Sequence, residues 1–150
     1  MQVREIMTKD VTALAPTATI AEVAQNMRYL NVGSIPLMQN DRLVGVITDR
    51  DIVVRVVADG LDPHLEQAEM HMTREPITVT PDTSVAEAAR VMASEQIRRL
   101  PVVEGGRLVG YLALGDLAVQ DKDKRVGDTL ERISEPAGTQ EGASERQVGR

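Results

Sequence analysis

The sequence contains no cysteine. Disulfide bonds, cysteine nucleophiles and metal sites built from thiolates are therefore excluded. A chain without cysteine is typical of a reducing compartment, in which disulfides are rare. Any stability must come from a packed core, for which 42% apolar residues are sufficient.

Aromatic residues are almost absent, because the chain has no Phe, no Trp and only Tyr29 and Tyr111. Its formal net charge at pH 7 is −6. Proteins that hold nucleic acid through its phosphates need a basic face. Proteins that bind single strands use aromatic side chains as stacking platforms. We therefore expect no nucleic-acid partner.

Long apolar runs are also missing. No run approaches the roughly 18 residues of a membrane-spanning helix. The first residues, "MQVREIMTKD", carry charges where a signal peptide would have an apolar core. We expect a soluble, cytoplasmic protein with no membrane partner.

What the sequence does contain is one pattern written twice. "GVITDRDIVV" begins at Gly45, and "GYLALGDLAV" begins at Gly110. At the same spacing, "RLVG" at 42–45 recurs at 107–110, and the Met-Thr pair at 7–8 recurs at 72–73. Repeats at a constant spacing indicate duplicated structural units. We infer an internal duplication.

Each copy predicts the same order of elements. An edge strand is indicated by "VTALAP" and by "ITVTP", which are rich in β-branched residues and end in proline. Capping boxes at Thr19 and Ser84 then predict helix starts. Apolar residues follow at helical spacing, at 20, 23, 24 and 27 and at 85, 88, 89 and 92.

Two strands and a second helix complete each copy. "SIPLMQ" and "RLVGVI" predict a hairpin that turns at Asn40-Asp41, and "RLPVVE" and "RLVGYL" predict one that turns at Gly105-Gly106. The second helix begins near Asp49 or Gly115. In the first copy, its expected apolar face is Ile52, Val53, Val56 and Val57.

The predicted fold is therefore α/β (α+β), with two β-α-β-β-α units related by a pseudo-twofold axis and packed through their sheets. We place the first unit at 1–60, a linker at 61–67 and the second unit at 68–121. A C-terminal helix is expected at 122–133, with Val126, Leu130 and Ile133 on one side. The segment 134–150 has little to bury, and we expect it to be disordered.

The repeated pattern resembles a known family. With h for an apolar residue, "h-x-h-P" followed by "LVG-h-h-[ST]-x-x-D-h" is similar to the cystathionine-β-synthase (CBS) domain, over about residues 1–121. A tandem pair resembles a Bateman module. The resemblance implies a regulatory unit that binds adenosine ligands in a cleft between the copies. AMP, ADP, ATP, NAD and S-adenosylmethionine are candidates, with AMP or ATP preferred. It also implies homodimers shaped as a flat disc.

The resemblance further implies two binding sites. Asp51 and Asp116 would hold the ribose hydroxyls of the ligand, and Thr48 would reach a phosphate. The Asp51 site would comprise Thr48, Asp51, Thr73, Thr78, Ile97, Arg98, Arg99, Val46 and Ile47. The Asp116 site would comprise Thr8, Ala13, Val32, Gly33, Ser34, Arg98, Leu112 and Asp116. Ala113 departs from the pattern, because it lacks the hydroxyl that Thr48 provides.

The chemistry of these residue types suits such a ligand. A helix that starts after a strand has unpaired N–H groups at an electropositive end, which favours a phosphate oxygen. A carboxylate can accept from two neighbouring ribose hydroxyls. Val46, Ile47 and Ile97 would form an apolar slot for adenine.

Each feature also has a structural interpretation. Thr48 and Asp51 have the spacing of a helix cap, which stabilises any helix by about 0.5–2 kcal/mol. Ala113 cannot cap through its side chain, which favours a ligand role for Asp116. Arg98-Arg99 is either a solvated strand start or a source of positive charge for a phosphate. His64 and His71 have no third ligand nearby, so we expect no metal site.

Three functional classes follow. The preferred hypothesis is a nucleotide sensor that signals to an unidentified effector protein. The alternative is a structural homodimerisation module without bound nucleotide. Catalysis is disfavoured, because the sequence shows no Ser-His-Asp or Cys-His arrangement and no Walker loop. We expect no enzymatic activity and no catalytic cofactor.

Overall fold

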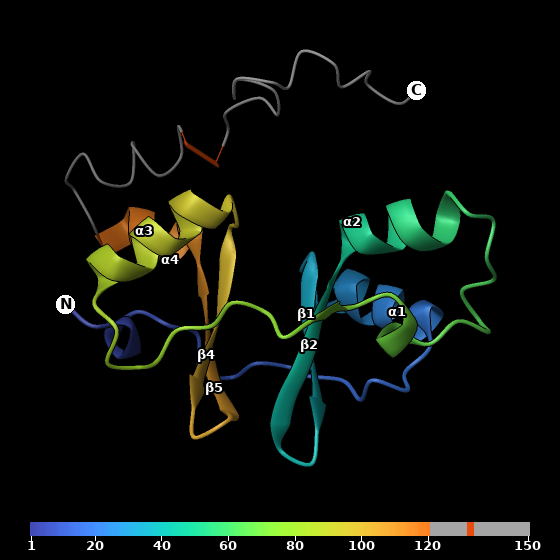
Figure 1. Cartoon of the computed structure of the whole chain (residues 1–150), viewed down its shortest axis with the longest axis horizontal. Helices are drawn as coiled ribbons and strands as arrows, with labels where there is room; N and C mark the ends of the chain where they lie inside the picture. Colours follow the sequence, from blue (N-terminus) through green and yellow to red (C-terminus); the bar gives the residue numbers. More distant parts are fainter. Residues whose placement is uncertain (121–131, 134–150) are drawn as a thin grey trace.

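Two β-hairpins lie next to each other at the centre of the molecule, and each is flanked by its own helices (Figure 1). The computed structural model describes residues 1–120 and 132–133. The hairpin strands are β1 (Ser34–Gln39), β2 (Arg42–Thr48), β4 (Arg99–Glu104) and β5 (Arg107–Ala113). Strands β2 and β5 contact each other across the boundary between the units. The prediction of a mixed fold built from two similar units is confirmed.

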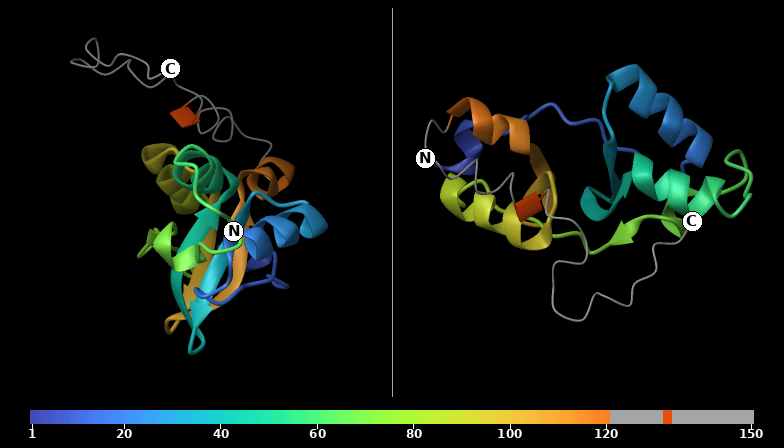
Figure 2. Two further views of the ribbon diagram at one scale, coloured as in Figure 1. Left: turned by 90° about the vertical axis from the view of Figure 1, so that its right-hand side faces the viewer. Right: turned by 90° about the horizontal axis from the view of Figure 1, so that it is seen from above.

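The helices occupy equivalent places in the two units (Figure 2). They are α1 (Ile20–Leu30), α2 (Asp49–Ile52), which continues as a π-helical turn η2 (Val53–Val57), α3 (Val85–Glu95) and α4 (Leu114–Gln120). The short elements are η1 (Val3–Glu5), η3 (Ala68–Met70) and β3 (Thr73–Arg74).

The hairpins turn where the sequence predicts. Asn40 and Asp41 have φ angles of 52° and 61°, and Gly105 and Gly106 have φ angles of 61° and 82°. Two successive left-handed residues are typical of the tight turn that matches the twist of a hairpin. The register also repeats, because the irregularity between Leu37 and Met38 has its counterpart between the corresponding residues of the second hairpin.

The first helix of each unit begins at its predicted cap. The Thr19 hydroxyl accepts from the Glu22 N–H at 3.2 Å, and the Ser84 hydroxyl accepts from the Glu87 N–H at 3.0 Å. The predicted stripes are largely buried: Ile20, Val23 and Met27 in α1, and Ala88, Ala89 and Met92 in α3. Ala24 differs and is exposed.

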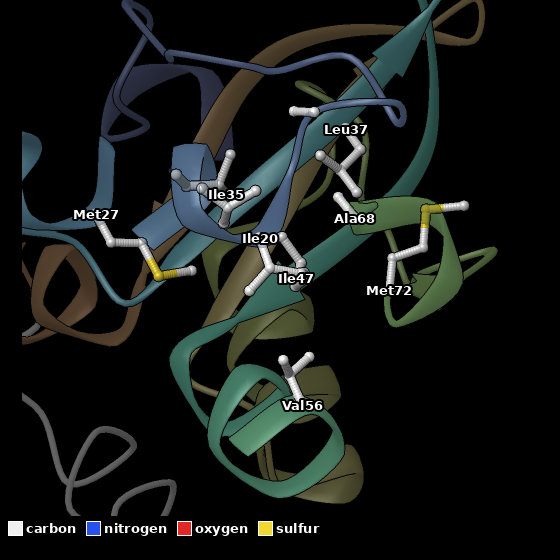
Figure 3. Close-up of a cluster of buried hydrophobic side chains, with 10 residues drawn as sticks. Ile20, Met27, Ile35, Leu37, Ile47, Val56, Ala68 and Met72 are labelled. Carbon is white, nitrogen blue, oxygen red and sulfur yellow. The ribbon is translucent and has the colours of Figure 1, made fainter. Parts of the chain in front are cut away.

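Each unit has its own core. The first contains Ile20, Ile35, Leu37 and Ile47 from the helix and hairpin, together with Val56, Ala68 and Met72 (Figure 3). The second contains Met92, Leu100, Val102, Leu112 and Leu117, together with Val3.

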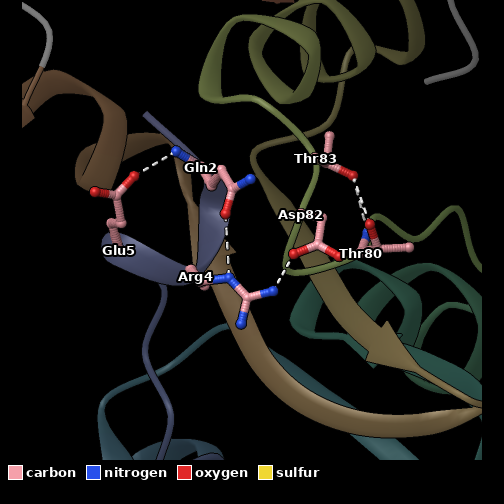
Figure 4. A network of polar contacts seen from close by, with 6 residues as sticks. All are labelled: Gln2, Arg4, Glu5, Thr80, Asp82 and Thr83. Atoms are coloured by element: carbon pink, nitrogen blue, oxygen red, sulfur yellow. Dashed lines mark hydrogen bonds and ion pairs between the residues drawn. The ribbon is translucent and has the colours of Figure 1, made fainter.

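Both cores include a segment from the other sequence repeat. Val3, at the start of the first repeat, is fully buried in the second core. Its backbone N–H donates to the Thr83 carbonyl at 2.8 Å. An ion pair between Arg4 and Asp82 lies beside this junction (Figure 4). In exchange, Ala68 and Met72 from the second repeat pack in the first core. The packing units are therefore interlocked.

Where each exchanged segment meets the inner strand of the other unit, a glycine of the strand lies against a methionine of the segment. A Cβ at Gly110 would lie 2.5 Å from Met7 Sδ and 3.1 Å from the Thr8 carbonyl oxygen. At Gly45, a Cβ would collide with Met72 and lie 2.9 Å from the Thr73 carbonyl oxygen. Glycine allows the exchanged segment to approach each inner strand this closely.

The predicted edge strands are shorter than expected. Leu14 and Val79 each form a single parallel bridge, to Leu37 and Val102. Two residues further on, Pro16 and Pro81 stand where the ladder would need its next N–H donor. Proline has no N–H, so the pairing ends after one bridge.

The expected apolar face of the second helix is only half correct. Val56 is fully buried and Ile52 is partly buried, but Val53 and Val57 are 58% and 64% exposed. Ile52 and Val56 lie four residues apart and share the inward face of the helix. Val53 and Val57 each lie one position later and are rotated toward solvent.

Near the C-terminus, Arg132 and Ile133 are helical, and Ile133 packs against the second core. Gln96 Nε2 donates to the Arg132 carbonyl at 3.1 Å. The remaining residues of the predicted helix at 122–133 and the tail at 134–150 lie outside the described residues.

Candidate functional site

The first candidate site is centred on Asp51, at the junction of β2 and α2. Asp51 Oδ2 accepts from the Thr48 N–H at 2.9 Å, and Thr48 Oγ1 accepts from the Asp51 N–H at 3.1 Å. Arg55 Nη2 lies 3.8 Å from Asp51 Oδ1, and the Asp51 side chain is 14% exposed. The cap is therefore complete, and it uses one carboxylate oxygen, while the other faces a guanidinium.

Asp116 occupies the equivalent position in the second unit. Asp116 Oδ2 accepts from the Ala113 N–H at 2.8 Å. The expectation that Ala113 leaves Asp116 without a capping role is therefore wrong, because the carboxylate caps the backbone although the hydroxyl is missing. Both aspartates have a structural role, and ligand binding would be an additional one.

The residues expected near Asp51 differ in accessibility. Thr73 pairs with Val46 across β3 and β2, so these two lie together. Thr73, Thr78, Arg98 and Arg99 are exposed, and Thr48, Val46 and Ile97 are partly exposed. Ile47 is fully buried in the first core. The prediction that Ile47 lines an adenine slot is therefore wrong, because the whole residue is buried and its side chain packs in the core.

The residues expected near Asp116 show a similar division. Thr8 and Arg98 are exposed, and Ala13, Val32, Gly33 and Ser34 are partly exposed. Leu112 is fully buried in the second core, so its side chain is not available to a ligand. The two units also share one backbone hydrogen bond beyond each hairpin. The Gly33 carbonyl accepts from the Asp49 N–H, and the Arg98 carbonyl accepts from the Leu114 N–H.

Tyr111 is a feature of this region that the motif does not predict. Its hydroxyl lies 2.8 Å from the Ser34 hydroxyl, and its backbone exchanges two hydrogen bonds with Thr8. Burial raises the pKa of Tyr111, partly offset by the Ser34 hydrogen bond and the charge of Arg99. The only signal in the sequence is an aromatic residue where the first copy has Val46.

Arg55 is a second residue whose role the sequence does not reveal. Besides facing Asp51, its Nη1 donates to the His71 carbonyl at 2.8 Å. The sequence pattern favours an arginine on the helix surface, and the Arg55 side chain is 48% exposed. What the pattern does not predict is its position between the Asp51 carboxylate and the segment exchanged between the repeats.

The described residues include one histidine–carboxylate contact but no candidate metal site. His71 Nε2 lies 3.2 Å from Glu66 Oε2, but residues 1–120 and 132–133 contain no group of three His, Cys, Asp or Glu that could hold a metal ion. Among the helices in this part of the chain, none has the length and apolar character to cross a membrane.

Comparison with known proteins agrees with this geometry. The family model for the CBS domain matches residues 3–58 and 68–121. The CBS domain-containing protein YhcV of Bacillus subtilis is 42% identical over 133 residues, which are 88% of this chain and 94% of that protein. Hypoxic response protein 1 of Mycobacterium tuberculosis is 36% identical over 135 residues, 89% of this chain and 94% of that protein.

Two solved structures are similar to this one. Hypoxic Response Protein I, solved with two coordinated zinc ions, has a TM-score of 0.75 and 36% identity, over 81% of this chain and 99% of that one. The CBS domain pair of protein MJ0100, solved with 5′-methylthioadenosine and S-adenosyl-L-methionine, has a TM-score of 0.72 and 28% identity, over 80% and 94% of the two chains. With two matched repeats and interlocked units, the chain belongs to the CBS domain family and carries a tandem pair of CBS domains.

Proposed function

We propose that this CBS pair is a regulatory module that binds an adenosine ligand. The observation that carries the proposal is the aspartate in the first turn after the inner strand of both units, Asp51 and Asp116. A similar CBS pair, that of MJ0100, was solved with two adenosine compounds. AMP and ATP are our preferred ligands, because Thr48 and the Arg98-Arg99 pair suit a phosphate.

The surroundings of Asp51 support a sugar phosphate. The capping bond occupies Oδ2, so Oδ1 is the oxygen that would accept from ribose hydroxyls. Arg55, 3.8 Å from this oxygen, keeps the local charge balanced. The Thr48 hydroxyl can donate to a phosphate while its oxygen accepts from the Asp51 N–H, and the electropositive N-terminus of α2 favours an anion there. The exposed guanidinium groups of Arg98 and Arg99 would add positive charge to an otherwise acidic protein.

The interlocked units suggest how binding is transmitted. Thr73 lies on the segment that pairs with β2 of the first unit, and the chain continues from it into the second unit. A ligand that contacts Asp51 and Thr73 together would favour one relative arrangement of the units. An effector protein would respond to that arrangement. We propose no catalytic step.

A homodimer is part of the proposal, and a surface supports it. Val53, Val54 and Val57, all on η2, are 50–64% exposed. Exposed apolar side chains grouped on one helix favour contact with another protein surface. The alternative function, a dimerisation module without nucleotide, would rest on this surface alone.

Thermal unfolding with AMP, ATP, NAD and S-adenosylmethionine tests the proposal. A ligand at a hundredfold excess over its Kd stabilises the folded state by about 2.7 kcal/mol per site, which raises the Tm by several degrees. Asp51→Ala should lose the shift, whereas the control Asp59→Ala, an exposed residue beyond η2, should retain it. If none of the four ligands raises the Tm of the wild-type chain, the proposal is wrong.

A further inference from the structure

Tyr111 connects the two units at the position where the Asp116 site is expected. Its side chain belongs to β5 of the second unit, and its hydroxyl lies 2.8 Å from that of Ser34, the first residue of β1. The residue is 8% exposed, and its backbone is bonded on both sides to Thr8. Ser34 and Thr8 are two of the residues that the family resemblance assigns to the Asp116 site.

The equivalent place in the first unit is built differently. Val46 occupies the position of Tyr111, is partly exposed, and pairs with Thr73. The position of Ser34 is taken by the exposed residue Arg99. The hydrogen bond between Ser34 and Tyr111 therefore has no counterpart in the first unit, because Val46 has no polar side-chain atom that could bond to Arg99.

We propose that Tyr111 closes the Asp116 site, so that the pair binds one adenosine ligand per chain, at Asp51. This inference rests on the proposed function and adds to it the stoichiometry and the residue that determines it. A ligand group that took the place of the Tyr111 hydroxyl beside Ser34 would break the Ser34–Tyr111 hydrogen bond and displace a buried ring toward water. Ala113 provides no hydroxyl that would replace the lost contact.

Two substitutions that replace residues of the second copy with their counterparts in the first should open the Asp116 site in two steps. Tyr111→Val gives the second unit the side chain of Val46 and removes the ring. Adding Ala113→Thr restores the phosphate-side hydroxyl of Thr48. The single variant should therefore admit a second adenosine compound without phosphate, and the double variant should admit a second AMP.

Calorimetric titration with 5′-methylthioadenosine and with AMP tests this. The wild-type chain should bind one AMP, and Asp51→Ala should abolish that binding. Tyr111→Val should bind two molecules of 5′-methylthioadenosine, and Tyr111→Val with Ala113→Thr should bind two of AMP. Two ligands on the wild-type chain, one ligand on both variants, or loss of the wild-type ligand in Asp116→Ala instead of Asp51→Ala would each overturn the inference. Absence of binding in every chain would instead refute the proposed function.

A second measurement does not depend on the folding of the Tyr111 variants. In a Tyr29→Phe chain, Tyr111 is the only tyrosine, and the sequence has no Trp. Its fluorescence should be equally protected from acrylamide quenching with and without saturating AMP. A ligand-induced increase in quenching would show that the ring is displaced, and would overturn the inference.

Discussion

Asp51 and Thr48 cap each other, with the Asp51 carboxylate 2.9 Å from the Thr48 nitrogen and the Thr48 hydroxyl 3.1 Å from the Asp51 nitrogen. In the second unit, only the carboxylate half of this arrangement remains, between Asp116 and Ala113. Both aspartates therefore contribute to stability whether or not a ligand is bound. Tests of function must separate the two contributions.

The missing hydroxyl predicts opposite effects in the two units. Thr48→Ala should reduce the free energy of unfolding by about 0.5–2 kcal/mol, because a helix N–H loses its acceptor. Ala113→Thr should increase it by a similar amount. Urea denaturation measures both. If Ala113→Thr leaves the midpoint unchanged while Thr48→Ala lowers it, the two junctions are not equivalent as described.

The ionisation of Tyr111 gives a pH-dependent prediction. In a Tyr29→Phe chain, absorbance titration should show Tyr111 ionising above the ordinary pKa of tyrosine, because burial disfavours the phenolate. Ser34→Ala should raise the pKa of Tyr111 further, because the Ser34 hydrogen bond lowers it. An unchanged or lower pKa in Ser34→Ala would contradict the hydroxyl pair.

The raised pKa of Tyr111 also determines how alkaline pH changes the stability of the fold. The unfolded chain releases the Tyr111 proton at a lower pH than the folded chain. The contribution of Tyr111 is therefore fully present below about pH 10 and is lost as the pH rises through the folded pKa. The decrease in Tm at alkaline pH should be smaller in Tyr111→Phe, which has no proton to release.

The exchange of segments predicts that the N-terminus stabilises the second unit. Val3 is fully buried in that core, so Val3→Ala should cost about 1–3 kcal/mol. The control Val119→Ala, on α4 of the same unit, removes a side chain that is 77% exposed and should change stability by less than about 0.5 kcal/mol. Equal effects on urea unfolding would mean that the N-terminal segment does not pack in the second core.

Close packing at Gly110 predicts a clash when a methyl group is added. Gly110→Ala should destabilise the fold by about 1–3 kcal/mol, because both Met7 Sδ and the Thr8 carbonyl lie near the new Cβ. The control is Gly115→Ala, where a Cβ in α4 meets no atom within 4 Å. That substitution should stabilise α4 by about 0.5–1 kcal/mol. A lower Tm in the control than in Gly110→Ala would contradict this packing.

The elements with local signals could be predicted from the sequence. The hairpins follow from their turn residues, and α1 and α3 follow from Thr19 and Ser84, because turns and caps depend on residues close in the chain. The exposure of Val57 could not be predicted, because helical spacing alone does not say how wide the buried stripe is.

Contacts between the two repeats could not be predicted from local features of the sequence. The Met-Thr pairs have the same sequence in both copies, so the pattern does not specify which inner strand each one joins. Tyr111 and Ser34 meet only because β1 and β5 come from different units. The capping role of Asp116 has no signal at Ala113, because a carboxylate can accept from the backbone N–H without a hydroxyl on the residue at the cap.

A structure of the chain with AMP bound would show whether Asp51 holds the ligand. We expect ribose hydroxyls within about 2.5–3.2 Å of Asp51 Oδ1, with the phosphate at the Thr48 hydroxyl, near the N-terminus of α2. A ligand bound away from Asp51, or a ribose that makes no contact with this carboxylate, would contradict it.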